Sequence, residues 1–440
     1  MAKIDVSQVE EIVADPKNDA WPVRASKATV CVIAAAHLST CPRMLKVADA
    51  LTTAGYRVRV VSARHTNWAV RLDEGLRSTR TWEWDVVDHG RSTAPQMWLR
   101  SGVRFRAAGL LTRALRPHRA PLPLIFHAWG RVHSELLQVA LTGPADLFYG
   151  GTNGGLSVAA MAGRRAGRPY ALDLEDFHTG ELEDGPEARF RHTLIERIER
   201  SVLPGATFLT AAGAAIADAY KRKYGVQPIP VNNTFPLPPA APDLSVSRGR
   251  ALTLYWFSQT IGPRRGLEDV IHATAIAQIP VEMHLRGNPI PGYVESLIAL
   301  AKQLRSNMKL VVHTPATPDS MIESCAGYDA GLALEPGFSC NNKIASSNKL
   351  FTYLLAGLPV ILTDTEGQRA VAWDLEDAAF IYQSGDVFAL AAGLRRWSQD
   401  KTLLSHAKVA AWNSAKRRWH WDHPLEKGAM LAAIARTLHI

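Results

Sequence analysis

The sequence predicts an α/β fold built from two doubly wound, Rossmann-like parallel sheets that face a common cleft. Short apolar runs typical of buried parallel strands alternate with amphipathic helical patterns along both halves of the chain. A stretch with six prolines, residues 226–250, interrupts this alternation, which then restarts. Because proline blocks regular structure, we expect this stretch to link two domains, and 440 residues are enough for two sizeable cores.

The N-terminal half opens with a strand–helix–strand unit, which is typical of a parallel sheet. The apolar run at 28–36 predicts the first strand, residues 43–56 carry apolar side chains at helical spacing, and residues 57–62 predict the second strand. Gly55 provides the helix stop. The same patterns predict strands at 146–149, 170–174 and 206–210, and helices at 156–166, 189–201 and 214–224.

The C-terminal half repeats this alternation after the proline-rich stretch. Its predicted strands lie at 253–257, 282–285, 309–312, 330–334 and 360–362, and its predicted helices at 266–277, 293–305, 320–326 and 349–356. In doubly wound folds the ligand binds outside the carboxyl ends of the strands, so we expect the site in the cleft between the two halves.

Composition excludes several classes of protein. The four cysteines form no CxxC pair, which argues against a zinc site or a disulfide scaffold. No run approaches eighteen uninterrupted apolar residues, and the acidic segment 1–18 lacks the apolar core of a signal peptide, so we expect a cytoplasmic protein without a transmembrane helix. The net charge of +9 invites a polyanionic partner.

This positive charge is concentrated in one segment. Residues 90–134 hold eight arginines and no acidic residue, whereas the rest of the chain is nearly neutral. Apolar residues recur here at helical spacing, at Leu99, Val103, Ala107, Leu110 or Leu111, and Leu115. One interpretation is a basic amphipathic helix that contacts an anionic membrane, at the inner face of the plasma membrane, or an anionic acceptor through residues such as Arg100 and Arg104. The other is a helix packed on the core with a solvated basic face. We expect no nucleic-acid partner, because no binding motif accompanies the charge.

The most specific pattern of the C-terminal half lies between two predicted strands. One strand ends near Glu335, a polar loop follows, and the next helix has Asn348 and Lys349 at its N-terminus. Free N–H groups at a helix start, with a lysine beside them, suit a diphosphate. The alternative is an ordinary helix for which Asn348 is only a cap.

In the N-terminal half, an acidic loop follows the strand at 170–174. Residues 173–181 contain four acids and one histidine, among them Glu175, Asp176 and His178. At a strand end facing a cleft, these three are candidates for the base or orienting group near an acceptor hydroxyl. A divalent-metal site and a solvated acidic loop are the alternatives. Asn153, in a glycine-rich loop, and His37 are further candidates for acceptor contacts.

Four segments together resemble the GT-B glycosyltransferases of the family-4 type. The strongest, residues 347–361 (SNKLFTYLLAGLPVI), is similar to the family's donor-site pattern N-K-L-x-E-Y-x-x-A-G-x-P-V. Residues 42–51, Arg265-Gly266 and the segment 419–422 (WHWD) also match the family in order and spacing.

The resemblance implies a domain organisation: an acceptor domain over 1–240, a nucleotide-sugar domain over 241–412 and a C-terminal helix, 413–440, that crosses back to the first domain. It implies transfer of a sugar from a nucleoside-diphosphate sugar to an acceptor hydroxyl with retention, in polysaccharide, glycolipid or natural-product biosynthesis. It also implies no metal and no cofactor besides that co-substrate. The implied donor-binding residues are Arg264, Arg265, Gly287, Asn348, Lys349 and Thr352, with Glu335 touching the transferred sugar.

Two positions depart from the family pattern. Thr352 stands where the family has a glutamate that holds the donor ribose, and Gln259 stands where it has an arginine for the diphosphate. A threonine cannot clamp two hydroxyls as a carboxylate does. The alternatives are therefore a GT-B protein that binds or regulates a partner without catalysis, or a nucleotide-sugar epimerase or hydrolase.

Overall fold

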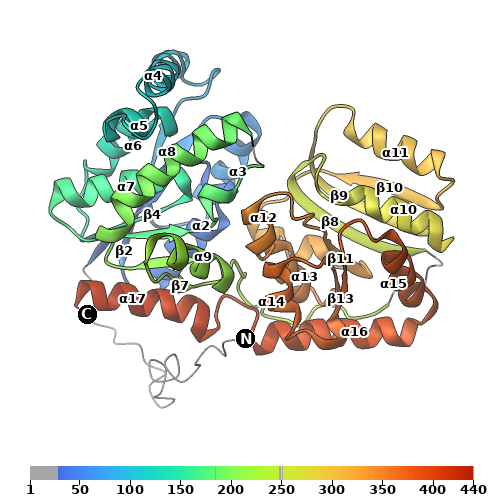
Figure 1. Cartoon of the computed structure of the whole chain (residues 1–440). Helices are drawn as coiled ribbons and strands as arrows, with labels where there is room; N and C mark the ends of the chain where they lie inside the picture. Colours follow the sequence, from blue (N-terminus) through green and yellow to red (C-terminus); the bar gives the residue numbers. More distant parts are fainter. Residues whose placement is uncertain (1–27, 184, 247–248, 250, 440) are drawn as a thin grey trace.

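The computed structural model describes residues 28–183, 185–246, 249 and 251–439. Within this range the chain forms two α/β domains, each built on one parallel sheet (Figure 1). The fold class predicted from the sequence is therefore confirmed. The N-terminal residues on which the signal-peptide expectation rests lie outside the described range.

The N-terminal domain has a seven-stranded sheet with the order β3-β2-β1-β4-β5-β6-β7. Its strands are β1 (Thr29–Ala34), β2 (Arg57–Arg64), β3 (Glu83–Asp88), β4 (Leu147–Gly151), β5 (Tyr170–Leu174), β6 (Leu209–Ala211) and β7 (Ile229–Pro230). Its helices are α2 (Pro42–Thr53), α3 (Asn67–Arg77), α4 (Pro95–Ala114), α5 (Leu122–Trp129), α6 (His133–Ala140), α7 (Thr152–Ala166), α8 (Pro186–Val202) and α9 (Ala214–Tyr224).

The C-terminal domain has a six-stranded sheet with the order β10-β9-β8-β11-β12-β13. Its strands are β8 (Leu252–Ile261), β9 (Val281–Pro289), β10 (Met308–His313), β11 (Ala330–Ala333), β12 (Val360–Thr363) and β13 (Ala379–Tyr382). Its helices are α10 (Leu267–Ala277), α11 (Tyr293–Gln303), α12 (Cys340–Ile344), α13 (Asn348–Leu355), α14 (Glu366–Ala372), α15 (Val387–Gln399) and α16 (Lys401–Arg417).

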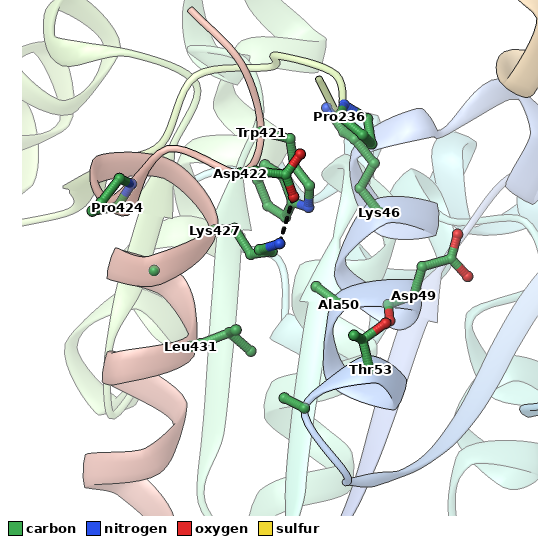
Figure 2. Close-up of a pocket in the computed structure, with 12 residues that line it drawn as sticks. Lys46, Asp49, Ala50, Thr53, Pro236, Trp421, Asp422, Pro424, Lys427 and Leu431 are labelled. Carbon is green, nitrogen blue, oxygen red and sulfur yellow. Dashed lines mark hydrogen bonds and ion pairs between the residues drawn. The ribbon is translucent and has the colours of Figure 1, made fainter. Parts of the chain in front are cut away.

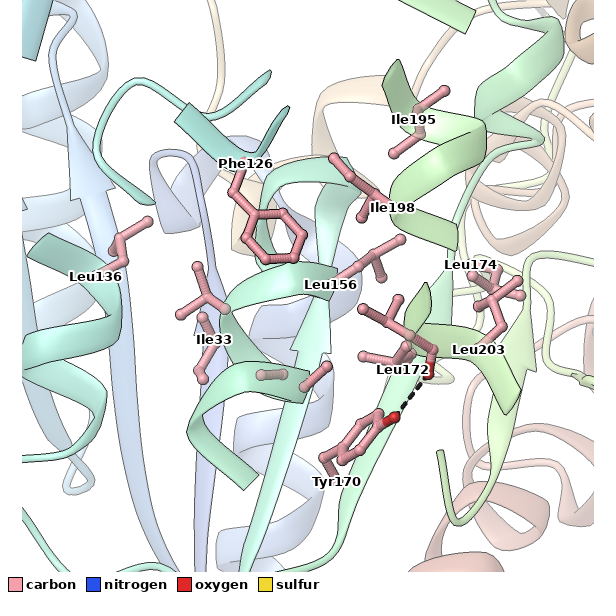
Figure 3. Packing of buried hydrophobic residues seen from close by; sticks show 14 of the residues in the cluster. Ile33, Phe126, Leu136, Leu156, Tyr170, Leu172, Leu174, Ile195, Ile198 and Leu203 are labelled. Atoms are coloured by element: carbon pink, nitrogen blue, oxygen red, sulfur yellow. Dashed lines mark hydrogen bonds between the residues drawn. The ribbon is translucent and has the colours of Figure 1, made fainter. Parts of the chain in front are cut away.

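Apolar side chains cover both faces of the N-terminal sheet. On one face, Ile33 and Leu172 of the sheet pack with Phe126 of α5, Leu156 of α7 and Ile198 of α8 (Figure 3). On the other face the core is formed with α2 and the C-terminal helix. This double burial explains why the strands read as continuous apolar runs in the sequence.

The strand order reverses between β1 and β4 in the first sheet and between β8 and β11 in the second. At such a reversal, the loops after the two neighbouring strands run to opposite faces of the sheet. A crevice then opens between these loops at the carboxyl ends of the strands. His37 and Glu335 lie in the loops that follow β1 and β11, and Gln259 lies near the carboxyl end of β8 itself. Asn153 lies in the first turn of α7, directly after β4, and not in the loop expected for it.

The chain crosses between the domains twice, and the two crossings are bonded together. The Trp421 N–H donates to the Phe235 carbonyl at 2.7 Å, and the buried Glu426 carboxylate accepts from Asn232 Nδ2 at 2.9 Å and pairs with Arg418 at 2.6 Å. Helix α17 (Ala429–Leu438) then packs on α2, whereas α16 packs on the C-terminal domain (Figure 1).

A cavity of about 550 Å³ lies between α2 and this returning segment, with Lys46, Trp421 and Lys427 among its lining residues (Figure 2). Lys46 donates to Asn233 Oδ1 at 2.9 Å and to the Thr234 carbonyl. Burial, reinforced by the nearby Arg43 charge, lowers the pKa of Lys46 to about 7. These contacts join α2 to the first crossing.

Two local predictions are wrong. The expected helix at 320–326 is replaced by two 3₁₀ turns, Pro318–Ser320 and Glu323–Cys325. Each turn is three residues long, a length at which 3₁₀ geometry commonly serves as a connector. The proline-rich stretch also contributes a strand: β7 pairs with β6 and forms the edge of the sheet, where proline is tolerated.

Candidate functional site

An interdomain cavity of about 480 Å³ brings residues of both domains together. Its lining includes, from the N-terminal domain, Ser39, Thr40, Trp68, Glu175 and Asp176, and, from the C-terminal domain, Gln259, Arg265, Arg286, Asn348 and Lys349. A second cavity of about 230 Å³ shares Glu175, Asp176 and Asn348 with the first and extends to Glu335. The two cavities therefore adjoin each other between the two domains.

On the C-terminal side, Glu335 and Lys349 form an ion pair of 2.8 Å whose side chains are 12% and 8% exposed. Asn342 Nδ2 donates to the second carboxylate oxygen at 3.2 Å, and Lys349 also donates to Ser347 Oγ at 3.2 Å. Burial alone would raise the pKa of Glu335, but the Lys349 and Arg265 charges outweigh it and lower the pKa to about 2. Glu335 therefore stays ionised and holds the ammonium group in place.

Lys349 belongs to the first turn of α13, which no side chain caps. The Leu350 N–H in this turn bonds the Ser347 carbonyl at 3.1 Å, which leaves the backbone N–H groups of Asn348 and Lys349 for a ligand at the cavity, where the helix dipole favours negative charge. Arg265 adds a second cation to the same cavity. This side of the site has the charge to hold a diphosphate, and the donor-binding role of these residues stays a prediction.

The turn that presents Arg265 depends on Gly266. This glycine has a φ of 68°, and a Cβ atom on it would lie 2.7 Å from the Leu334 carbonyl oxygen. Arg264 projects differently: it is exposed and pairs with Glu183 of the other domain at 2.5 Å. Gly287 lies on β9 behind the cavity, where a Cβ atom would meet the Ser258 carbonyl oxygen at 2.3 Å. It permits close packing behind Ser258, which lines the cavity.

The two departures from the family pattern have defined places. Thr352 is fully buried, and its hydroxyl donates to the Asn348 carbonyl at 3.1 Å within α13, so it lines neither cavity. Gln259 lines the larger cavity and donates across the domain boundary to the Thr40 carbonyl at 3.2 Å. Both side chains are engaged within the protein.

On the N-terminal side, Glu175 and Asp176 line both cavities. Burial, together with the charges of Asp176 and Asp173, raises the pKa of Glu175 to about 7. Asp173 itself faces the interior of the domain, where Arg43 pairs with it at 2.6 Å. Glu175 is thus a carboxyl group that changes its charge near neutral pH, at the cavity wall.

Asn341, in the C-terminal domain, bonds the acidic loop of the N-terminal domain across the cleft. Its Nδ2 donates to Asp176 Oδ1 at 2.7 Å, and its Oδ1 accepts the Phe177 N–H at 2.7 Å. One side chain of α12 therefore makes two hydrogen bonds to the acidic loop across the cleft.

Replacing Asn341 by alanine should shift the ligand-free protein toward an open form. Each of the two lost hydrogen bonds contributes about 1 kcal/mol, so we expect the closed population to fall about tenfold or more relative to the open one. Small-angle scattering would record this change as a larger radius of gyration. The exposed Asn307 provides the control, as Asn307→Ala; an unchanged radius for Asn341→Ala would contradict the prediction.

His178 lies behind the acidic loop and lines neither cavity. It is buried, with Nδ1 3.0 Å from both Glu199 Oε1 and the Tyr220 hydroxyl. Burial would lower its pKa, but the hydrogen bond to Glu199 and the carboxylates around it raise the pKa to about 9. The structure therefore separates His178 from Glu175 and Asp176, and its contacts are those of a residue that anchors the loop.

The other N-terminal candidates also lie apart from the two cavities. His37 Nδ1 is 2.7 Å from Asp73, and its Nε2 accepts the backbone N–H groups of His65 and Thr66 at 2.9 Å, which occupies both ring nitrogens. The Asn153 carbonyl accepts from Trp129 at 3.2 Å.

Arg100 and Arg104 belong to α4, outside the cleft. Arg104 pairs with Glu135 at 2.6 Å, and Arg100 is exposed. A role for these residues, or for His37 and Asn153, in acceptor binding stays a prediction. Among the residues that the structure describes, no group of three or more His, Cys, Asp or Glu side chains is arranged to hold a metal ion.

Trp68, Arg286 and Asn341 are site residues that the sequence did not single out. Trp68 is 37% exposed and lines the larger cavity, although it stands in an otherwise polar stretch after β2. Arg286 lies near the end of β9, where its Nε donates to Tyr255 at 2.6 Å. The available signals were a lone tryptophan shortly after a strand for Trp68 and an arginine within a strand pattern for Arg286.

Solved glycosyltransferase structures resemble this chain over almost its whole length. HepE from Anabaena, solved with UDP and glucose, has a TM-score of 0.63 at 18% identity, covering 94% of this chain and 99% of HepE. Sucrose-phosphate synthase from Thermosynechococcus elongatus gives 0.61 at 12% identity, covering 94% and 99%. TarM from S. aureus, solved with Fondaparinux, alpha-GlcNAc-glycerol and UDP, gives 0.60 at 7% identity, covering 94% and 100%. The sequence matches no protein-family model and no curated protein. The chain therefore has the GT-B fold that its sequence predicted.

Proposed function

We propose that the protein is a glycosyltransferase that moves a sugar from a nucleoside-diphosphate sugar to an acceptor hydroxyl, with retention at the anomeric carbon. One observation carries the proposal: the interdomain cavity has cations on the C-terminal side and carboxyl groups on the N-terminal side. The two sides suit the two reactants of such a transfer. The UDP found in the HepE and TarM structures supports a uridine nucleotide as the first donor to test.

The donor diphosphate would lie against Lys349, Arg265 and the first N–H groups of α13. When the bond between the anomeric carbon and the β-phosphate oxygen breaks, negative charge grows on the departing diphosphate. Fixed cations and helix N–H groups in a shielded site stabilise that charge without reorganising. This arrangement needs no bound metal and no further cofactor. Glu335 fixes the position of Lys349, and its carboxylate lies next to the place of the transferred sugar.

The acceptor would enter from the N-terminal side, where its hydroxyl meets Glu175 or Asp176. The hydroxyl oxygen forms the new bond to the anomeric carbon on the face from which the diphosphate leaves, as retention requires, and its proton must leave as that bond forms. A carboxylate within hydrogen-bond reach orients the hydroxyl and accepts the proton. With its raised pKa, Glu175 is well matched to this task at neutral pH.

Transfer should therefore depend on pH through Glu175. Because the pKa of Glu175 is raised to about 7, its ionised fraction grows as the pH rises from about 6 to 8. We expect kcat/KM to rise over that interval and to level off above it. Glu175→Gln should flatten the rise and lower the plateau by about two orders of magnitude.

The control for this experiment is Glu187→Gln, which removes an exposed acid of α8 that pairs with Arg113. It should keep the wild-type pH profile. A rise that persists in Glu175→Gln would assign the titration to another group and contradict the role of Glu175.

A second candidate function, binding of a nucleotide sugar or a partner without transfer, is favoured by the place of Thr352. Its hydroxyl is used inside α13, so position 352 offers the donor ribose no contact in the cavity. A panel of nucleoside-diphosphate sugars separates the two functions. Binding with slow hydrolysis of one donor supports the transferase, binding without any turnover supports the second candidate, and no binding by any donor contradicts the transferase.

A further inference from the structure

Helix α4 carries an apolar stripe on its outer surface. Leu99, Val103, Leu110 and Leu111 are 58%, 56%, 69% and 54% exposed, and Leu115 just after the helix is 50% exposed. With Ala107 and Ala114 between them, they follow one side of the helix at three- and four-residue spacing. These apolar residues therefore face solvent. The interpretation in which they pack on the core, with only a basic face solvated, is excluded for this stripe.

The inner face of α4 explains this orientation. It consists of small side chains, Ser101, Gly102, Ala108 and Thr112, all buried against the domain. Arg131 lies across this face: its Nε donates to Ser101 Oγ at 3.0 Å, and its guanidinium also bonds the Trp98 carbonyl. A Cβ atom on Gly102 would lie 2.9 Å from Arg131 Nη2. Large side chains do not fit here, so the helix is held with its leucines outward.

Positive charge surrounds the stripe. Arg104 and Arg113 pair with Glu135 and Glu187. Between residues 99 and 119, four further arginines are exposed and have no acidic partner among the described residues: Arg100, Arg106, Arg116 and Arg119. An exposed apolar stripe bordered by unpaired arginines is suited to a surface with an anionic outer layer and an apolar layer directly below it.

We propose that α4 docks the protein on the surface of an anionic phospholipid bilayer, with its leucines among the upper acyl chains and its arginines at the phosphates. No described helix is long and apolar enough to cross a membrane, so α4 would lie along the surface. A second copy of the chain fits the stripe less well, because a face-to-face pair would bring two sets of unpaired arginines together. The inference stands apart from the transfer reaction, since it uses no residue of the cleft.

The position of α4 gives the docking a consequence for the site. Figure 1 shows α4 at the outer end of the N-terminal domain, on the side away from α16 and α17, where the two chain crossings close the molecule. A bilayer in contact with α4 would therefore lie on the side of the N-terminal domain opposite the two chain crossings. An acceptor anchored in that bilayer would approach the N-terminal side of the cleft.

Sedimentation with lipid vesicles tests the proposal on the full-length protein. We expect binding to vesicles of phosphatidylglycerol and phosphatidylcholine, weak binding to phosphatidylcholine alone, and loss of binding as salt rises. The double variant Leu99→Glu/Leu110→Glu should weaken binding by more than about tenfold. Replacing Arg100, Arg106 and Arg116 by glutamine should weaken it about fivefold for each charge removed.

The matched control is Phe388→Glu, because Phe388 is 72% exposed on α15 in the other domain. It should bind vesicles like the wild type. The proposal is overturned if the wild type ignores anionic vesicles or if Leu99→Glu/Leu110→Glu binds them equally well. It is also overturned if the only effect of that variant is to dissociate a dimer in analytical ultracentrifugation, which would assign the stripe to a second copy. All variants should bind UDP as the wild type does, so failure here is distinct from failure of the transferase proposal.

Discussion

Lys349→Met should lower turnover by about two to three orders of magnitude and weaken UDP binding in parallel. Lys349 lies in the uncapped first turn of α13, lines the cavity and is held by Glu335 at 2.8 Å. Its charge is therefore fixed where a diphosphate would sit, before any ligand arrives. Steady-state kinetics with the active donor, and calorimetric titration with UDP, would measure the two losses.

A stability effect must be separated from this loss of binding. Removing Lys349 leaves the shielded Glu335 carboxylate without its counter-charge, which costs about 3 to 5 kcal/mol for a buried pair. The double variant Glu335→Gln/Lys349→Met removes both charges and should recover most of the unfolding free energy. We expect it to regain stability but not UDP affinity.

Lys309→Ala is the matched control, because Lys309 is 66% exposed in its pair with Glu282. Exposed pairs of this kind contribute at most about 1 kcal/mol, so this variant should behave like the wild type. If the double variant binds UDP with wild-type affinity, the assignment of the diphosphate to Lys349 is wrong.

The fold was predictable because its strands and helices are coded locally. β1 and β5 are buried along their whole length, so they appear in the sequence as apolar runs bounded by polar loops. α9 was predicted with its observed bounds, since Gly225 follows it in the left-handed conformation. The helix expected at 320–326 failed because a short apolar pattern does not distinguish one α-helix from the two 3₁₀ turns that form there.

The candidate site was predictable only where its residues are adjacent in sequence. Asn348 and Lys349 occur in one motif, and the structure places both at the cavity. In the acidic loop, by contrast, the direction of each side chain depends on a distant partner. Asp173 turns inward to Arg43 of α2 and His178 turns to Glu199 of α8, which leaves Glu175 and Asp176 at the cleft.

The exposed face of helix α4 also could not be predicted from local sequence alone. Its spacing correctly indicated a helix, but apolar spacing alone does not say which face is buried. The small residues Ser101, Gly102 and Ala108, together with Arg131 from another segment, decide that the apolar stripe faces outward. Volume at the contact, and not hydrophobicity, sets the orientation.

Asp173→Asn should destabilise the N-terminal domain by about 3 to 5 kcal/mol. Arg43 and Asp173 are 2% and 1% exposed, and two parallel hydrogen bonds of 2.6 and 2.7 Å join them. Asp173 also accepts from Thr210 at 2.5 Å, and Arg43 donates to the Val231 carbonyl at 2.5 Å. The pair therefore ties α2, β5 and β6 to the first crossing between the domains. Urea unfolding followed by tryptophan fluorescence would measure the loss.

Asp218→Asn is the control for the loss of one negative charge. Asp218 is exposed on α9, so this variant should have the same stability as the wild type. Arg43→Met/Asp173→Asn should recover part of the loss, because no unpaired charge then remains in the core. Asp173 stands two residues before Glu175, so a shift of β5 moves the acceptor side of the cleft while the donor side, on the other domain, keeps its geometry. We therefore expect Asp173→Asn to lower transfer but to bind UDP normally below its unfolding transition. Weaker UDP binding by the folded variant would contradict this division of the site between the two domains.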